Sequence, residues 1–199
     1  MFKRKCKITF ITHGATVHSM DGVLSDSEKF PKINDVGEEE LEKVCEYLAK
    51  RGVQYDKIYT STSTRCTQSA QIVAKLFKKR TTTIDLPSRR LGEWSGQSFN
   101  DIYEQYGADA IISGTKGGES LEAFNTRVGK VIEKLVEENH GNRIIVVTTP
   151  DVVQAAVALT LNLTPENQFK NLIKTGSLTQ ISYFVDNWSS VIYSDYIPL

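Results

Sequence analysis

"KITFITHGATVHS", residues 7–19, begins with the pattern of a buried strand and ends in small and polar residues. The run Ile8–Ile11 within it has the largely apolar, β-branched composition of a strand inside a sheet. His13 and Gly14 follow almost directly, and the carboxyl end of a central strand is where α/β proteins gather functional groups. A histidine held structurally by one hydrogen bond fits the segment equally well. The segment therefore predicts a central strand and makes His13 a candidate site residue.

Strand and helix patterns alternate along the rest of the chain. Apolar residues recur at helical spacing in residues 34–52, 64–79, 120–139 and 151–162. Strand-like runs or alternations occupy residues 56–61, 81–86, 142–149, 177–186 and 189–196. Residues 87–117 are rich in glycine, serine and charge, and we expect a loop there with a short helix near 99–106. This order predicts an α/β fold in which residues 1–199 form a single domain, a three-layer sandwich with a mainly parallel sheet and helices on both faces.

The composition suits one globular domain and argues against several classes of function. Of the 199 residues 40% are hydrophobic, and the 24 basic residues balance the 24 acidic ones. This balance leaves no overall field to attract nucleic acid or an anionic membrane, so any anion site must be local. The apolar run near the N-terminus is too short for a signal peptide or a membrane span, and we expect a cytoplasmic protein.

Three cysteines, Cys6, Cys45 and Cys66, lie far apart and form no C-x-x-C pair. This spacing indicates neither a disulfide framework nor a zinc site. We therefore expect the protein to use no metal and no cofactor.

The segment "YTSTSTRCTQSA", residues 59–70, ends the second predicted strand in a hydroxyl-rich turn. It places Arg65 in the first turn of a helix, where free backbone N–H groups and the helix dipole favour an anion. A guanidinium adds a bidentate donor for phosphate or carboxylate. Arg65 is thus a candidate for anion binding, with an ordinary surface arginine as the alternative.

Four motifs, in this order, resemble those of the histidine phosphatase superfamily, the phosphoglycerate-mutase-like proteins. Thr12-His13-Gly14-Ala15-Thr16 matches the family's Arg-His-Gly-x-Thr, and residues 60–70 match its Ser-Ser-Pro-x-x-Arg turn. Gly92-Glu93-Trp94-Ser95-Gly96 matches its Gly-x-Trp-Glu-Gly. Gly118-Glu119-Ser120 matches the Gly-Glu-Ser that precedes a long helix in the family. The resemblance runs nearly end to end and implies a phosphoglycerate-mutase-like fold. It also implies two-step phosphoryl transfer: one histidine becomes phosphohistidine, two arginines and a second histidine bind the phosphoryl oxygens, and a carboxyl group protonates the leaving oxygen.

The sequence departs from this family pattern at the positions that matter most for catalysis. Thr12 stands in place of the first arginine, Thr149 in place of the second histidine, Ser88 in place of the acid and Ser19 in place of a frequent phosphate-binding asparagine. The resemblance makes His13 the nucleophile of any reaction and implies a phosphate site formed by Arg65, Thr12, Gly14, Ser19 and Thr149. A positioned acid contributes roughly 10²–10⁴-fold in rate and an oxyanion donor about 10²–10³-fold, so we expect little turnover.

Two carboxyl groups and three cations are candidates to replace the missing groups. Glu93 in the Gly-x-Trp motif and Asp151 beside the vacated histidine position are speculative acids; a solvated loop residue and a helix N-cap are the simpler interpretations. Arg89, Arg90 and Lys116 lie in the segment expected above the pocket. A solvated charge cluster is the alternative for these three.

Two hypotheses of different class follow. In the first, the chain is a pseudo-phosphatase that binds a small phosphorylated molecule, an inorganic anion or a protein partner. In the second, it is a phosphatase that acts on a small phosphorylated metabolite through phosphohistidine at His13, with a relocated acid. Mutase activity is a weaker third hypothesis, because a mutase must bind a bisphosphate and stay phosphorylated. We favour the first, since the site rather than the fold determines function.

Overall fold

The computed structural model describes residues 3–26 and 31–198, and the strands within them form one sheet. They are β1 (Arg4–Thr12), β2 (Lys57–Ser61), β3 (Thr81–Ile84), β4 (Arg143–Thr148), β5 (Leu178–Phe184) and β6 (Ser189–Tyr196). Their order across the sheet is β3-β2-β4-β1-β5-β6, with β3, β2, β4 and β1 parallel to one another. β5 and β6 pair antiparallel. The expected α/β class with a mainly parallel sheet is confirmed.

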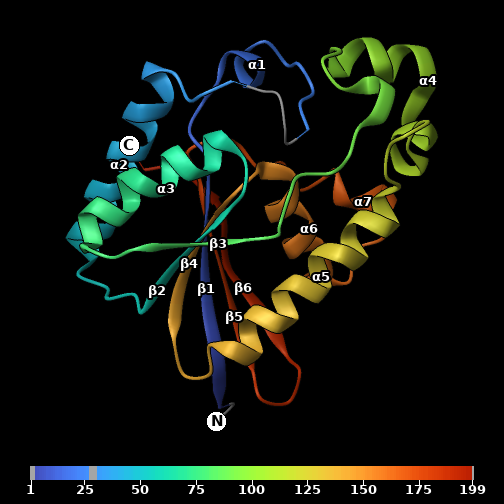
Figure 1. Cartoon of the computed structure of the whole chain (residues 1–199). Helices are drawn as coiled ribbons and strands as arrows, with labels where there is room; N and C mark the ends of the chain where they lie inside the picture. Colours follow the sequence, from blue (N-terminus) through green and yellow to red (C-terminus); the bar gives the residue numbers. More distant parts are fainter. Residues whose placement is uncertain (1–2, 27–30, 199) are drawn as a thin grey trace.

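Helices cover both faces of this sheet (Figure 1). They are α1 (Val17–Met20), α2 (Asp35–Arg51), α3 (Thr64–Phe77), α4 (Phe99–Ser113), α5 (Leu121–Glu138), α6 (Pro150–Leu161) and α7 (Pro165–Gln168), with a 3-10 turn η1 (Gly92–Trp94). α2 and α3 pack with Ile145 and Val147 of β4, whereas α5 and α6 pack with Ile144 and Val146. Successive side chains of a strand point to opposite faces, so the apolar run of β4 is buried on both sides.

The segment 87–117 is more helical than its sequence indicates. α4 extends well past the short helix expected near residues 99–106 and is interrupted at Gly107, where φ is 76°. Ile102 and Ile111, on either side of this break, pack with Trp94 in a small separate cluster. Gly107 interrupts the helical spacing of apolar residues, which is why the sequence pattern underestimates this helix. In the described ranges, none of the helices is both long and apolar enough to cross a membrane.

The carboxyl ends of β1 and β4 lie side by side, and the loop after β1 packs closely against α2. The His13 N–H donates to the Thr148 carbonyl (2.9 Å), which continues the pairing of the two strands past their ends. A Cβ atom on Gly14 would lie 2.3 Å from the Gly37 carbonyl oxygen, and one on Gly37 would lie 2.4 Å from the Ala15 carbonyl oxygen. The two glycines therefore allow backbone contact between the loop and the first turn of α2, and this contact fixes the position of His13.

Substitution of Gly37 tests this contact. Alanine normally stabilises a helix relative to glycine by up to about 1 kcal/mol, but Gly37→Ala forces two backbone segments apart and should lower the free energy of unfolding by at least about 2 kcal/mol. Gly129→Ala in α5 is the matched control, because its Cβ would lie 3.4 Å from a Leu159 methyl group, an ordinary contact. Urea denaturation measures both; equal effects at the two positions would contradict the close approach.

Candidate functional site

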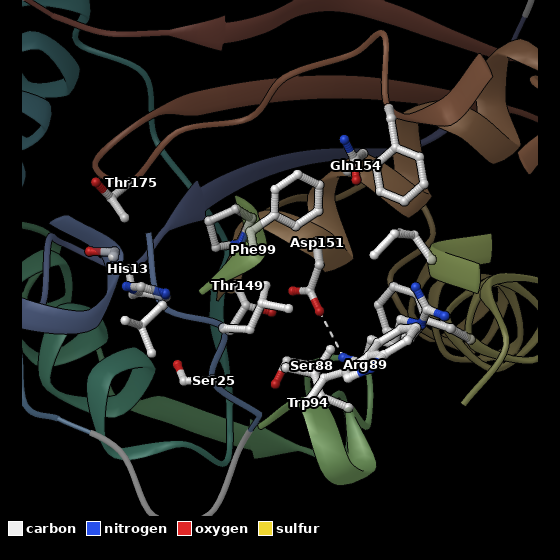
Figure 2. A pocket seen from close by; sticks show the side chains of 18 of the residues that line it. His13, Ser25, Ser88, Arg89, Trp94, Phe99, Thr149, Asp151, Gln154 and Thr175 are labelled. Atoms are coloured by element: carbon white, nitrogen blue, oxygen red, sulfur yellow. Dashed lines mark hydrogen bonds between the residues drawn. The ribbon is translucent and has the colours of Figure 1, made fainter. Parts of the chain in front are cut away.

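A cavity of about 250 Å³ lies above the carboxyl ends of the parallel strands (Figure 2). One part of its lining is polar: His13, Thr16, Ser19, Ser25, Arg65, Ser88, Thr149 and Thr175. Another part is apolar: Val23, Leu24, Leu91, Trp94, Phe99, Ile111, Leu121, Phe124 and Phe169. The cavity brings His13 and Arg65 together, with residues of the segment 87–117 over them, as the motifs predict. Such a lining suits a small molecule with one polar end and an apolar body.

His13 is oriented and kept neutral by its surroundings. Its side chain is buried, and Nδ1 lies 2.8 Å from the Gly14 carbonyl oxygen. A carbonyl can only accept, so Nδ1 carries the proton and Nε2 keeps its lone pair when the ring is neutral. Burial, aided by the positive charge of Arg65, lowers the pKa of His13 to about 3. The ring is therefore neutral over the physiological range, the form that a histidine nucleophile requires.

Arg65 is the buried cation beside His13. It lies in the first turn of α3, where the N-cap Ser63 makes no side-chain cap hydrogen bond. Nη1 and Nη2 donate to the hydroxyl (3.0 Å) and the carbonyl (3.1 Å) of Ser25. Within the part of the chain that the structure describes, Arg65 Nε has no hydrogen-bond partner although it is buried. An unsatisfied buried donor beside a cavity favours an anionic ligand there.

The other residues expected at the phosphate differ in where they point. Ser19 and Thr149 line the cavity together with Arg65. Gly14 acts through its backbone, because its carbonyl accepts from the His13 ring and its N–H donates to Ser69 Oγ (3.2 Å). Thr12 lies outside the lining as far as the structure describes it. Its hydroxyl donates to the Lys174 carbonyl (2.7 Å) and accepts from the Ser177 N–H (2.8 Å), so it supports the backbone instead of facing the cavity.

Two hydroxyls lie at the positions that the sequence analysis matched to the family's second histidine and acid. Thr149 is the N-cap of α6 but makes no side-chain cap hydrogen bond. Its Oγ1 and the Ser88 Oγ are buried and have no hydrogen-bond partner among residues 3–26 and 31–198. Both residues line the cavity. The two hydroxyls can donate hydrogen bonds to a bound anion, but they bring no charge.

Asp151 and Glu93, the two speculative acids, lie in different environments. Glu93 is exposed in η1, outside the cavity lining as described. Asp151 is the one carboxylate in the described lining, and Figure 2 shows it near the centre of the cavity. Its Oδ2 accepts from the Arg89 N–H (2.7 Å) and its Oδ1 from the Val152 N–H (2.9 Å). Both oxygens therefore serve as acceptors, and the carboxylate joins α6 to the loop that contains Ser88.

An ion pair between the buried Glu119 and the partly exposed Arg127, which the sequence analysis did not identify, supports this loop. Glu119 accepts from Nε and Nη2 of Arg127, both at 3.0 Å. Arg127 also donates to the carbonyls of Pro87 (3.1 Å) and Ser88 (3.2 Å). Although burial opposes ionisation, the hydrogen bonds from Arg127 and the Arg90 N–H lower the pKa of Glu119. The Gly-Glu-Ser motif could have indicated this ion pair from the sequence, because it places Glu119 eight residues before Arg127.

The three cations that the sequence analysis singled out in the segment 87–117 differ in exposure. Arg90 and Lys116 are exposed, whereas Arg89 is buried and lines the cavity. No group of three or more potential metal ligands occurs among the residues whose positions are described.

The neutral His13 makes stability depend on pH. The unfolded chain protonates this histidine near its ordinary pKa of 6.5, but the folded protein does so only near pH 3. Between these values the unfolded state binds more protons, so the free energy of unfolding falls as the pH falls. From about pH 6 to 4, we expect the free energy of unfolding, measured by urea denaturation, to fall by about 1.4 kcal/mol per pH unit more in the wild type than in His13→Asn. Parallel pH profiles would mean that His13 is not held neutral.

Comparisons with known proteins agree with this geometry. The model of the histidine phosphatase superfamily (branch 1) matches residues 8–195. A broad-specificity phosphatase of Saccharomyces cerevisiae is 26% identical over 194 residues, covering 94% of this chain and 83% of that protein. A metal-independent phosphoserine phosphatase of Arabidopsis thaliana is 25% identical over 201 residues, covering 93% and 82%.

Solved structures show the same fold at lower identity. YhfR of Bacillus stearothermophilus superposes with a TM-score of 0.85 at 19% identity, covering 96% of this chain and 98% of that one. A phosphoserine phosphatase of Entamoeba histolytica, solved with 3-phosphoglyceric acid, gives a TM-score of 0.83 at 18% identity, covering 96% and 97%. With the family match over nearly its whole length, this chain belongs to the histidine phosphatase superfamily, branch 1.

Proposed function

We propose that this chain binds a phosphorylated or otherwise anionic small molecule through Arg65 and His13, and that its catalytic pocket is degenerate, with little turnover of ordinary phosphomonoesters. The observation that supports this most is the pair of buried, unpartnered hydroxyls of Ser88 and Thr149 within the described part of the cavity. They provide hydrogen bonds for an anion where the family has an ionisable acid and a histidine. A bound anion is therefore a better explanation of the cavity than a protein partner.

The missing charge and the missing acid affect different parts of the reaction. Phosphoryl transfer is stabilised mainly by positive charge on the equatorial oxygens, and Arg65 is the cation whose charge acts on His13. An alkoxide leaving group also needs a proton, and a serine hydroxyl such as that of Ser88 is far too weak an acid to supply one near neutral pH. Asp151 would first have to give up a hydrogen bond from the Arg89 or Val152 N–H.

A slow phosphomonoesterase is the second candidate function. It is favoured by the neutral His13 ring, whose Nδ1–H is bound to the Gly14 carbonyl and whose Nε2 is free of a proton. Relatives named as phosphatases support the same candidate. In this case Asp151 is the first choice for the acid, because it is the carboxylate in the described lining of the cavity. Mutase activity is less well supported, because a mutase needs enough positive charge in its site to bind two phosphate groups.

Inorganic phosphate tests the binding site directly. With one guanidinium and neutral hydroxyls as donors, we expect a dissociation constant on the order of millimolar, about −4 kcal/mol. Arg65→Gln should abolish binding measured by calorimetry, whereas Arg90→Gln, which removes an exposed cation, should not change it. Micromolar binding, or binding that survives Arg65→Gln, would contradict the assigned site.

Hydrolysis assays separate the two candidate functions. We expect alkyl phosphates to be hydrolysed barely above background. Aryl phosphates, whose phenoxide leaves with less help, should show at most a trace that His13→Asn removes. Turnover of an alkyl phosphate on the order of 1–10³ per second would refute the degenerate pocket, and loss of that turnover in Asp151→Asn would identify the acid.

The double variant Ser88→Glu, Thr149→His is the gain-of-function arm of this assay. It restores an acid and a cationic donor at the two unpartnered hydroxyls, so activity should rise by several orders of magnitude. Thr12 is left unchanged, because its hydroxyl hydrogen-bonds the backbone of Lys174 and Ser177. No gain in a folded double variant would mean that the scaffold no longer holds the catalytic geometry.

A further inference from the structure

Glu40 of α2 lies next to the loop that carries His13, although it is outside the cavity lining as described. It follows Gly37 by almost one helical turn, so the two residues face the loop together. Its Oε2 accepts from the Ala15 N–H (2.8 Å) and its Oε1 from the Thr175 hydroxyl (3.2 Å). Both carboxylate oxygens are therefore bound to the two loops beside His13.

The Ala15 N–H belongs to the same peptide unit as the carbonyl that orients the His13 ring. This unit joins Gly14 to Ala15, and it is trans, so its C=O and N–H point in opposite directions. The C=O accepts from His13 Nδ1 (2.8 Å), and the N–H donates to Glu40 (2.8 Å). One rigid peptide unit therefore links the carboxylate to the imidazole ring.

A chain of hydrogen bonds of this kind strengthens its members. A carboxylate that accepts from the N–H of a peptide polarises the unit and makes its carbonyl oxygen a better acceptor. A better acceptor at Gly14 favours the neutral ring with its proton on Nδ1, because the other neutral form has no donor for this carbonyl. The favoured form leaves the lone pair on Nε2.

The neighbouring backbone holds Glu40 in this position. A Cβ atom on Gly176 would lie 2.5 Å from the Glu40 Cβ, so the loop at Thr175 packs directly on the glutamate side chain. The same loop is bound to the nucleophile segment, because the Gly176 N–H donates to the His13 carbonyl (3.1 Å). The glutamate and the histidine are therefore held in a fixed relation.

We propose that Glu40 is a positioning residue for His13, which fixes the Nδ1–H tautomer and the orientation of the ring through the Gly14–Ala15 peptide. The carboxylate acts through this peptide and adds no atom to the described lining of the cavity. For the role of His13 this inference rests on the proposed function, because both concern the same site. The chain of hydrogen bonds requires no bound anion, so it can be tested in the free protein.

Nitrogen-15 NMR of the histidine rings at neutral pH tests this inference. The chain has three histidines, and the signals lost in His13→Asn identify the His13 ring. Wild type should show one His13 tautomer, with the proton on Nδ1 and its resonance far downfield. Glu40→Gln, which keeps an acceptor but removes the charge, should move this resonance upfield. Glu39→Gln, which removes an exposed charge from the preceding residue of α2, should leave it in place.

A purely structural role for Glu40 predicts a different result. Its loss would then lower the free energy of unfolding while the Nδ1–H resonance and the tautomer stayed the same, and that outcome would overturn the inference. In Glu40→Ala, which removes both acceptor oxygens, we expect ring signals of the Nε2–H tautomer to appear as well. If Glu40→Ala does not fold, the comparison of Glu40→Gln with Glu39→Gln decides the question.

Calorimetry with inorganic phosphate on the same variants separates this inference from the proposed function. If the His13 resonance shifts in Glu40→Gln but phosphate does not bind to wild type, the positioning of the ring stands and the proposed function is wrong. If phosphate binds in an Arg65-dependent way but Glu40→Gln leaves the His13 resonance unchanged, the proposed function stands and the positioning residue is overturned.

Discussion

The hydrogen bond from the His13 N–H to the Thr148 carbonyl determines where the polar groups of the cavity lie. Because it extends the parallel pairing of β1 and β4, the loop after β1 and the first turn of α6 leave the sheet together. Glu40 of α2 supports the same loop, since its carboxylate accepts from the Ala15 N–H (2.8 Å) and the Thr175 hydroxyl (3.2 Å). His13 is thereby fixed by backbone contacts that do not depend on any catalytic partner.

The charged side chains in the described lining of the cavity are Arg65, Arg89 and Asp151. Arg65 and Arg89 are both buried, and each is hydrogen-bonded mainly to carbonyl or hydroxyl oxygens instead of carboxylates. Glu119 and Arg127, by contrast, form a paired and fully hydrogen-bonded support for the loop at Ser88. The described lining thus has two cations for one carboxylate, Asp151, in contrast to the paired Glu119 and Arg127.

Periodicity was sufficient to predict the strands and helices α2, α3, α5 and α6, since their apolar residues face one sheet. The motifs also placed His13 and Arg65 in one site, because both follow parallel strands whose carboxyl ends meet at one edge. The direction of the Thr12 side chain was not predictable, because its partner Lys174 comes from a distant loop. The burial of Arg89 likewise depends on carbonyls that α4 provides, and Gly107 hid the length of that helix.

Under the proposed function, hydroxyls at the positions matched to an acid and a histidine affect the bound state and the transition state differently. Catalysis requires interactions that are stronger in the transition state than in the ground state. Neutral donors such as Ser88 and Thr149 can hydrogen-bond a tetrahedral phosphate, but neither hydroxyl can transfer a proton to an alkoxide leaving oxygen near neutral pH. Asp151, fixed by two backbone N–H groups, adds a negative charge to the same lining. The proposed function, a stable bound anion with little phosphoryl transfer, follows from these differences.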